Sequence, residues 1–280
     1  MSILEAILLG IIQGLSEFIP ISSTAHVTIA GQLLGLIDPA HPERWTSFIA
    51  VIQLGTLAAV FVYFKKEIHD IPIAWVKENL LSRKKVKEQS SDSKMGWYIL
   101  IGSIPIATLG LALKDIIEGS LTKDPLVIAS SLIGLAIILA IAEKFAKLNK
   151  GITEITWKDS LLVGVAQVFA LIPGSSRSGT TITAGLLLGM SRETAARFSF
   201  LLSIPAIFGS GMLSFVQSLE YLQADDILTL VVATIVSGIS GYFAIDFLIK
   251  FLKTRTTLLF IIYRIVLGIA IIVLVYTAIL

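Results

Sequence analysis

Two short apolar stretches of the chain each run into a proline and then into a cluster of hydroxyl side chains, and these segments carry the residues best suited to chemistry. Residues 13–26 contain Glu17, Ser23 and His26, and residues 167–181 contain Arg177. A carboxylate and an imidazole can move protons, a hydroxyl can attack as a nucleophile, and a guanidinium can bind phosphate. The pattern predicts two halves of one polar site.

The composition places this site in a membrane. The chain has 280 residues, of which 55% are hydrophobic and 15% charged, with a mean hydropathy of +0.87. That leaves too little polar surface to cover a water-soluble globule. The absence of cysteine excludes disulfides, thiolate metal sites and a thiol nucleophile. The start of the chain lacks a basic region, so we expect the N-terminus to belong to the fold, and we expect no nucleic-acid partner.

The lengths of the apolar segments predict which of them cross the bilayer. Four pieces are too short, because about 13 residues reach only about 20 Å across a ~30 Å core. We expect these pieces to form two re-entrant helical hairpins, 3–37 and 160–190, each broken at a proline-containing turn. The predicted fold is therefore an all-α polytopic membrane protein with six spans; ten full spans are the alternative. The six spans are predicted at 47–64, 96–113, 125–142, 194–217, 227–249 and 257–279.

The charged loops predict the orientation of the chain. Lysine and arginine are concentrated in residues 65–94 and 144–158, whereas residues 220–226 are acidic. The positive-inside rule then makes the Lys-rich loop 65–94 cytoplasmic and puts the acidic loop and both termini outside.

Short sequence matches between the two halves indicate an internal repeat. Residues 9–13 resemble 163–167, and the Ile-Pro-x-Ser-Ser of 19–23 recurs at 172–176. We predict one integral membrane domain made of two repeats, 1–150 and 151–280, each with one hairpin and three spans. Because three is odd, the second repeat must be inverted. Transporters often use such repeats, so this architecture fits a carrier as well as an enzyme.

The first hairpin offers groups for proton transfer and metal binding. Gln13 and Glu17 are four residues apart and therefore share one face of the incoming helix. Pro20 ends that helix, and a hydroxyl in the turn can cap the next one. A purely structural pairing of Glu17 with His26 is the alternative.

The second hairpin predicts an anion site. A helix that opens in a glycine- and serine-rich turn directs its first amides at an anion, and Arg177 adds a fork that matches phosphate. An arginine that only caps carbonyls is the alternative. The predicted phosphate-binding residues are Ser175, Ser176, Arg177, Ser178, Gly179 and Thr181.

Taken together, the two motifs resemble those of the undecaprenyl-pyrophosphate phosphatase family, which is associated with bacitracin resistance. The resemblance rests on the two motifs, spanning 13–26 and 173–181, and on Tyr263-Arg264 near the end of the chain. It implies hydrolysis of undecaprenyl diphosphate, which regenerates the lipid carrier for cell-wall synthesis. It also implies a bacterial plasma membrane location, with the site open to the periplasmic or extracellular side.

The resemblance further implies roles for individual residues. Glu17 matches the second acidic position of the family, and Ser23 and His26 match its catalytic hydroxyl and imidazole. Ser176, Arg177 and Thr181 match its diphosphate binders, and we count Arg177 among the catalytic residues because it neutralises charge on the phosphoryl group.

Gln13 stands where many members have glutamate, so one negative charge is missing at this position. We expect Glu17, substrate oxygens and water to hold Mg²⁺ or Ca²⁺, and a part for Gln13 in binding the metal stays open. Our hypothesis has Ser23 as the nucleophile, His26 moving its proton, and Glu17 orienting the imidazole or the metal; attack by His26 or by an activated water stays open.

The partners implied are a polyprenyl diphosphate lipid and the bilayer, and the sequence leaves a homodimer open. The competing function is a polyprenyl-phosphate transporter or flippase with the same inverted repeat.

Overall fold

The computed structural model describes residues 1–219 and 224–277, except for the side chains of 118, 120, 218 and 224–226. Within these residues the secondary structure is helical, with one isolated bridge between Lys150 and Met190. Six helices are long and apolar enough to cross a membrane, which confirms the six predicted apolar segments and indicates a multi-pass membrane protein. They are α3 (Pro42–Tyr63), α5 (Ser91–Ala112), α7 (Pro125–Phe145), α10 (Arg192–Ser218), α11 (Ala224–Thr254) and α12 (Leu258–Tyr276).

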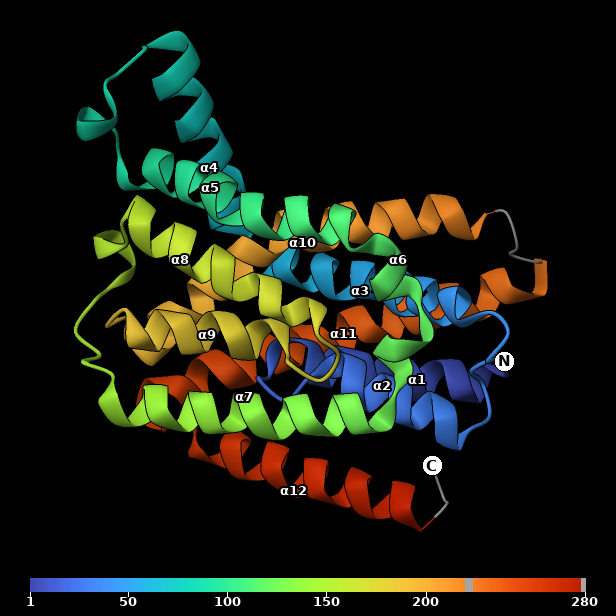
Figure 1. Cartoon of the computed structure of the whole chain (residues 1–280). Coiled ribbons are helices and arrows are strands. Elements are labelled where there is room, and N and C mark those ends of the chain that lie inside the picture. Colours follow the sequence, from blue (N-terminus) through green and yellow to red (C-terminus); the bar gives the residue numbers. More distant parts are fainter. Residues whose placement is uncertain (220–223, 278–280) are drawn as a thin grey trace.

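Two pairs of shorter helices form hairpins between these six. The first pair is α1 (Ile3–Phe18) with α2 (Ser23–Leu33), and the second is α8 (Trp157–Val168) with α9 (Arg177–Leu187). The short η5 turn (Phe169–Leu171) follows α8. In Figure 1 the pairs enter from opposite ends of the bundle, and their turns meet in its middle.

Several predicted hairpin boundaries were wrong by a few residues. α8 starts at residue 157 rather than 160 because Thr156 and Asp159 form a capping box there. α2 ends at Leu33, short of residue 37, and Gly35 then takes a positive φ of 66°. α9 begins at Arg177 because Ser176 is its N-cap, and it ends at Leu187, short of the predicted hairpin end at 190.

The remaining elements connect the spans. α4 (Lys65–Val76), the π-helical turn η1 (Lys77–Leu81) and the short η2 (Val86–Glu88) lie between α3 and α5. α6 (Lys114–Glu118) and η3 (Ser120–Lys123) join α5 to α7, and η4 (Ile152–Glu154) precedes α8. The start of α1 and the end of α12 lie at one end of the bundle, and the segments 65–90 and 146–156 lie at the other (Figure 1). Of the predicted acidic loop, residues 220–223 lie outside the described part of the chain.

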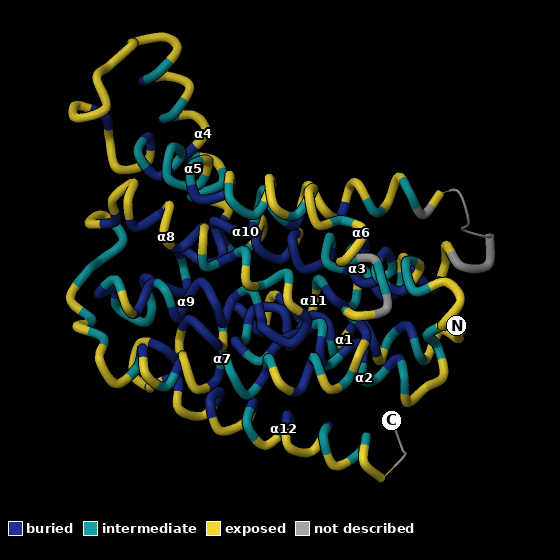
Figure 2. Tube along the Cα trace, in the orientation of Figure 1, coloured by how far each residue is buried: buried dark blue, intermediate teal, exposed yellow. Residues whose placement is uncertain are grey.

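Glycines let the hairpin helices approach the spans closely. A Cβ on Gly10 or Gly14 of α1 would collide with the backbone of α11. In the second hairpin, a Cβ on Gly164 of α8 would collide with Gly102 of α5. In both hairpins, therefore, glycine allows close helix packing: α1 packs against α11, and α8 packs against α5. Figure 2 shows that the middle of the bundle, where the turns meet, is largely buried.

Candidate active site

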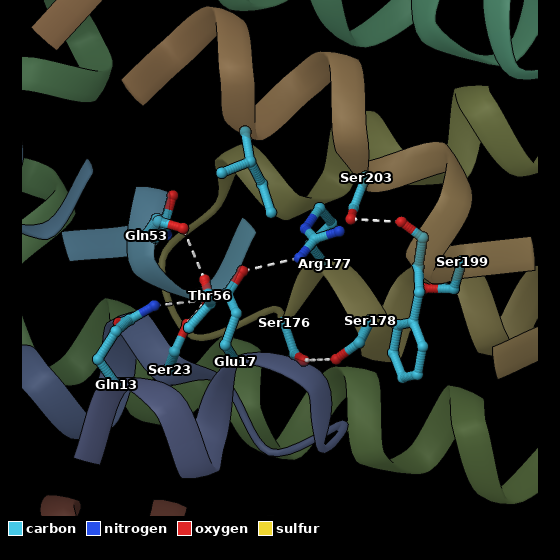
Figure 3. Close-up of polar contacts among 12 residues, drawn as sticks. Gln13, Glu17, Ser23, Gln53, Thr56, Ser176, Arg177, Ser178, Ser199 and Ser203 are labelled. Atoms are coloured by element: carbon cyan, nitrogen blue, oxygen red, sulfur yellow. Dashed lines mark hydrogen bonds and ion pairs between the residues drawn. The ribbon is translucent and has the colours of Figure 1, made fainter. Parts of the chain in front are cut away.

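Glu17 lies at the centre of the polar cluster. It is in the last turn of α1 and is 5% exposed. Its Oε2 accepts hydrogen bonds from Ser23 Oγ at 2.6 Å and from Gln13 Nε2 at 2.8 Å. Its Oε1 accepts from Arg177 Nη2 at 2.7 Å (Figure 3). A single carboxylate therefore joins α1, the start of α2 and the start of α9.

Arg177 supplies the cation for this carboxylate from the other hairpin. It is the first residue of α9, after Ser176, whose φ of 68° turns the chain sharply into the helix. While Nη2 binds Glu17, the buried Nη1 has no hydrogen-bond partner within the described structure. Leaving such a donor unpaired in the interior is costly, so Nη1 is a position where a bound oxyanion would be stabilised.

Some polar groups in the rest of the α9 turn already make hydrogen bonds within the protein, and others are left to bind a ligand. Thr181 is engaged, because its hydroxyl bonds to the Arg177 carbonyl at 2.8 Å and to Ser199 Oγ at 2.6 Å. Ser178 Oγ donates to the Ile19 carbonyl of the first turn at 3.3 Å. By contrast, Ser175 Oγ is buried and has no partner among the described residues. The backbone N–H groups of the first turn have no acceptor within the helix itself.

Ser176 and Gly179 shape this turn. Ser176 Oγ accepts from the Gly179 amide at 3.1 Å, which caps α9, and it lies 3.1 Å from Ser178 Oγ (Figure 3). Gly179 leaves room for the guanidinium of Arg264, because a Cβ there would lie 2.7 Å from Arg264 Nη1. Both residues therefore hold the shape of the turn.

The structure separates His26 from Ser23, although both are on α2. Ser22 caps α2, and its carbonyl accepts from His26 Nδ1 at 2.7 Å. A carbonyl can only accept, so Nδ1 carries a proton, and in the neutral imidazole Nε2 accepts from Tyr263 Oη at 2.7 Å. The hydroxyl of Ser23 instead donates to Glu17. The contact expected between His26 and Ser23 is therefore replaced by one between Glu17 and Ser23.

Arg264 was missed as a site residue by the sequence reasoning. This guanidinium on α12 is fully buried and donates to the carbonyls of Pro20 at 3.2 Å, Gly174 at 3.2 Å and Ser175 at 3.0 Å. It also donates from Nε to Leu132 of α7 at 3.2 Å. Arg264 thus ties the two hairpin turns to each other. The available signal was a lone arginine inside the most apolar of the six spans.

The cation site predicted at Gln13 and Glu17 depends on which oxygen atoms near these residues could bind Mg²⁺ or Ca²⁺. Among the described residues no group of three or more histidine or acidic side chains gathers. Gln13 Oε1, however, is buried and without a partner in the described structure, while its amide nitrogen faces Glu17. A carbonyl oxygen beside a carboxylate is suited to a hard cation that takes its other ligands from phosphate and water. Gln13 and Glu17 therefore fit Mg²⁺ or Ca²⁺ as a partial ligand set.

These features define a class: a helical multi-pass membrane protein with a buried site whose unpaired donors suit a phosphate group. The chain matches the model of the family described as bacitracin resistance protein BacA over residues 6–270. The chain belongs to this family.

Curated relatives are similar over almost their whole length. A protein of Syntrophobacter fumaroxidans named undecaprenyl-diphosphatase is 55% identical, with 96% of this chain and 95% of the relative covered. Proteins of the same name from Chlorobium phaeobacteroides and Chloroherpeton thalassium are 50% and 49% identical. The first covers 97% of this chain and 96% of the relative, and the second covers 96% and 95%.

Proposed function

We propose that this protein hydrolyses undecaprenyl diphosphate to undecaprenyl phosphate and inorganic phosphate. The family, and relatives named undecaprenyl-diphosphatase at 49–55% identity, support this activity. The observation that carries it is the contact between Arg177 and Glu17, which leaves one buried guanidinium nitrogen free for an oxyanion beside a hydroxyl held by a carboxylate. Recycling of the lipid carrier for peptidoglycan synthesis and resistance to bacitracin follow from this reaction.

Glu17 is the proton acceptor that the contacts favour. Ser23 Oγ attacks the terminal phosphorus, and its proton passes along the 2.6 Å hydrogen bond to Glu17 Oε2. The bond between the terminal phosphorus and the bridging oxygen breaks, and the lipid monophosphate leaves. Water then hydrolyses the phosphoserine, which releases inorganic phosphate and restores Ser23. Glu17 thus takes the role of base that the sequence reasoning had assigned to His26.

Arg177 and the start of α9 stabilise the charge. Nη1 and Ser175 Oγ, which are buried and unpaired within the described structure, and the amides of Arg177 and Ser178, for which the helix itself offers no acceptor, are the donors that we propose for the oxygens of the transferred phosphoryl group. A divalent cation held by Gln13 and Glu17 would shield the charge of the diphosphate. His26 holds its Nδ1 proton on the Ser22 carbonyl and its Nε2 against Tyr263. Attack by His26 would first require Tyr263 to move away.

We further propose that both hairpins are re-entrant and that the two repeats are inverted. Their helices are 11 to 16 residues long, which is too short for a ~30 Å core. The exchanged packing also supports inversion: α1 of the first repeat packs on α11 of the second, and α8 packs on α5. Both hairpins turn through a serine N-cap with positive φ, at Ser22 and Ser176. By the positive-inside rule, the end with segment 65–90 faces the cytoplasm. The family resemblance supports a site that opens to the other side.

Phosphate release by the purified protein in detergent tests the function, because detergent removes the two sides that transport requires. We expect release from undecaprenyl diphosphate. Binding of the lipid phosphate without release would refute hydrolysis and favour the transporter.

The nucleophile is tested by two neighbouring serines. Ser23→Ala should lower kcat by at least roughly 1,000-fold, since the attacking group is lost. Ser22→Ala is the matched control, because it removes a cap worth about 0.5–2 kcal/mol of stability and leaves the Ser23 hydroxyl in place. A Ser23→Ala enzyme as active as Ser22→Ala would assign the attack to His26 or to water, and trapped phosphohistidine would identify His26.

A further inference from the structure

The segment between α3 and α5 forms an arm with its apolar side facing outward. The arm comprises α4, η1 and η2, residues 65–90. Ile73, Val76 and Leu80 follow a spacing of three and four residues and so share one helical face, yet all three are exposed. Leu81 is 76% exposed and Val86 is 56% exposed. A water-surrounded helix would turn such a face to its core, so this exposure requires an apolar neighbour.

The inner side of the arm carries polar side chains that bond to one another and to the start of α5. Glu78 Oε2 accepts from the Ser90 amide at 2.8 Å. Asn79 Oδ1 accepts from Gln89 Nε2 at 2.8 Å and from Trp97 Nε1 of α5 at 3.0 Å. These bonds fix the arm to the start of α5. The outward direction of the apolar face is therefore built into the fold.

The position of the arm indicates what its apolar face meets. In Figure 1 the arm projects from the side of the bundle at α5, across the direction of the spanning helices. Along the axis of the bundle, it lies at the same height as the ends of α8 and α9. Figure 2 shows most of it exposed. The ends of spanning helices lie at the boundary between hydrocarbon and head groups, so a sideways projection at this level passes over lipid.

The charge of the arm selects the lipid. Residues 77–90 contain five lysines or arginines against two glutamates. Arg83, Lys85 and Lys87 are exposed next to the apolar residues, and Lys84 bonds to Glu78 at 3.4 Å. Cations beside an inserted apolar face are the pattern that binds anionic head groups.

We propose that the arm is an interfacial lipid-binding element, which inserts its apolar face into the bilayer surface and binds anionic phospholipid through Arg83, Lys85 and Lys87. It holds anionic lipid against the end of the bundle opposite the start of α1. This binding is separate from the phosphatase reaction, and the test below does not depend on activity.

Because the chain has no cysteine, a single Leu80→Cys in the full-length protein can carry a fluorophore in nanodiscs of phosphatidylcholine and phosphatidylglycerol. We expect strong quenching by spin-labelled lipid and weak quenching by aqueous iodide. Val62→Cys, on the exposed flank of α3, is the control for lipid contact, and Lys147→Cys, in the loop before α8, is the control for water contact. If iodide quenched the label at position 80 as strongly as the one at 147, insertion into the bilayer would be refuted. This is also the result expected if the face binds a protein partner, because that partner is missing from the nanodiscs and the face would then be open to water.

The choice of lipid is tested by placing the spin label on phosphatidylglycerol or on phosphatidylcholine. We expect the glycerol lipid to quench the label at position 80 several-fold more. The preference should fall toward unity in the triple variant R83Q/K85Q/K87Q, since each cation contributes roughly a fivefold factor near an anionic surface. Lys84 is kept so that the pair with Glu78 still holds the arm. Equal quenching by both lipids in the unmodified arm would overturn the anionic preference.

Discussion

Replacing Arg177 by lysine separates its two functions. A lysine amine can keep the ion pair with Glu17, which Arg177 Nη2 makes at 2.7 Å, but one nitrogen cannot also take the place of the free Nη1. Arg177→Ala is less informative, because breaking a buried ion pair by removing one partner costs about 3–5 kcal/mol and threatens the fold itself.

The expected loss follows from the one bond that Nη1 would make. A hydrogen bond to a charged group contributes about 1.5–3 kcal/mol. Since about 1.4 kcal/mol corresponds to tenfold in rate, Arg177→Lys should lower kcat/KM by roughly 10- to 150-fold. Charge on the phosphoryl oxygens grows toward the transition state, so we expect the loss mainly in kcat rather than in KM.

The assay is phosphate release by purified protein in detergent over a range of substrate concentrations, with the melting temperature measured alongside. Arg192→Lys is the matched control, because Arg192 also pairs with a partly buried carboxylate, Glu143, but at the start of α10 outside the hairpin turns. We expect its rate per folded molecule to stay within about twofold of wild type. If Arg177→Lys kept wild-type kcat/KM, or lost no more than Arg192→Lys, the assignment of Nη1 to the phosphoryl group would be refuted.

Three further outcomes are expected. Tyr263→Phe removes the donor at 2.7 Å from His26 Nε2 and, because Glu17 rather than His26 takes the Ser23 proton, should leave kcat/KM within about twofold of wild type; a loss or gain of tenfold or more would place His26 in the reaction. Gly174→Ala places a Cβ at a φ of 87° and against α7. It should lower the free energy of unfolding by more than the ~1–2 kcal/mol that the backbone conformation alone costs, and so lower the melting temperature. Gly110→Ala, with open space around it, should be neutral or stabilising, and equal effects would contradict this packing. The hydrogen bond from the N-cap amide of α5 outweighs burial and holds the pKa of Glu78 below its usual value. The stabilisation is therefore present above the usual glutamate pKa of about 4.3 and lost as the pH falls through the lowered value. The protection of the amides of residues 77–90 against hydrogen exchange, corrected for the intrinsic rate at each pH, should fall only in acid, and Glu78→Gln should remove this dependence.

Much of the fold could be predicted because lipid imposes simple rules. A span needs about 20 apolar residues, and backbone groups in hydrocarbon must bond within a helix, so length and composition located all six spans. Pro20 and Pro173 marked the two turns, since neither residue can continue a helix. Helix ends were less predictable, because a cap such as Thr156 with Asp159 can add a turn of polar residues to an apolar segment.

The types of site residue were also readable, but their pairing was not. The sequence by itself determined that a carboxylate, a hydroxyl, an imidazole and a guanidinium stand beside two proline turns, because such groups are too costly in a membrane to be incidental. Only the tertiary structure decided that Glu17 meets Ser23 and Arg177, and that Arg264 binds both turns. Residue spacing shows which side chains share a face of one helix, but it does not show which separate helices meet. Arg177 lies 160 positions from its partner Glu17, and Arg264 lies 244 positions from its partner Pro20. Those contacts depend on how closely the glycine-lined helices pack, which local sequence does not specify.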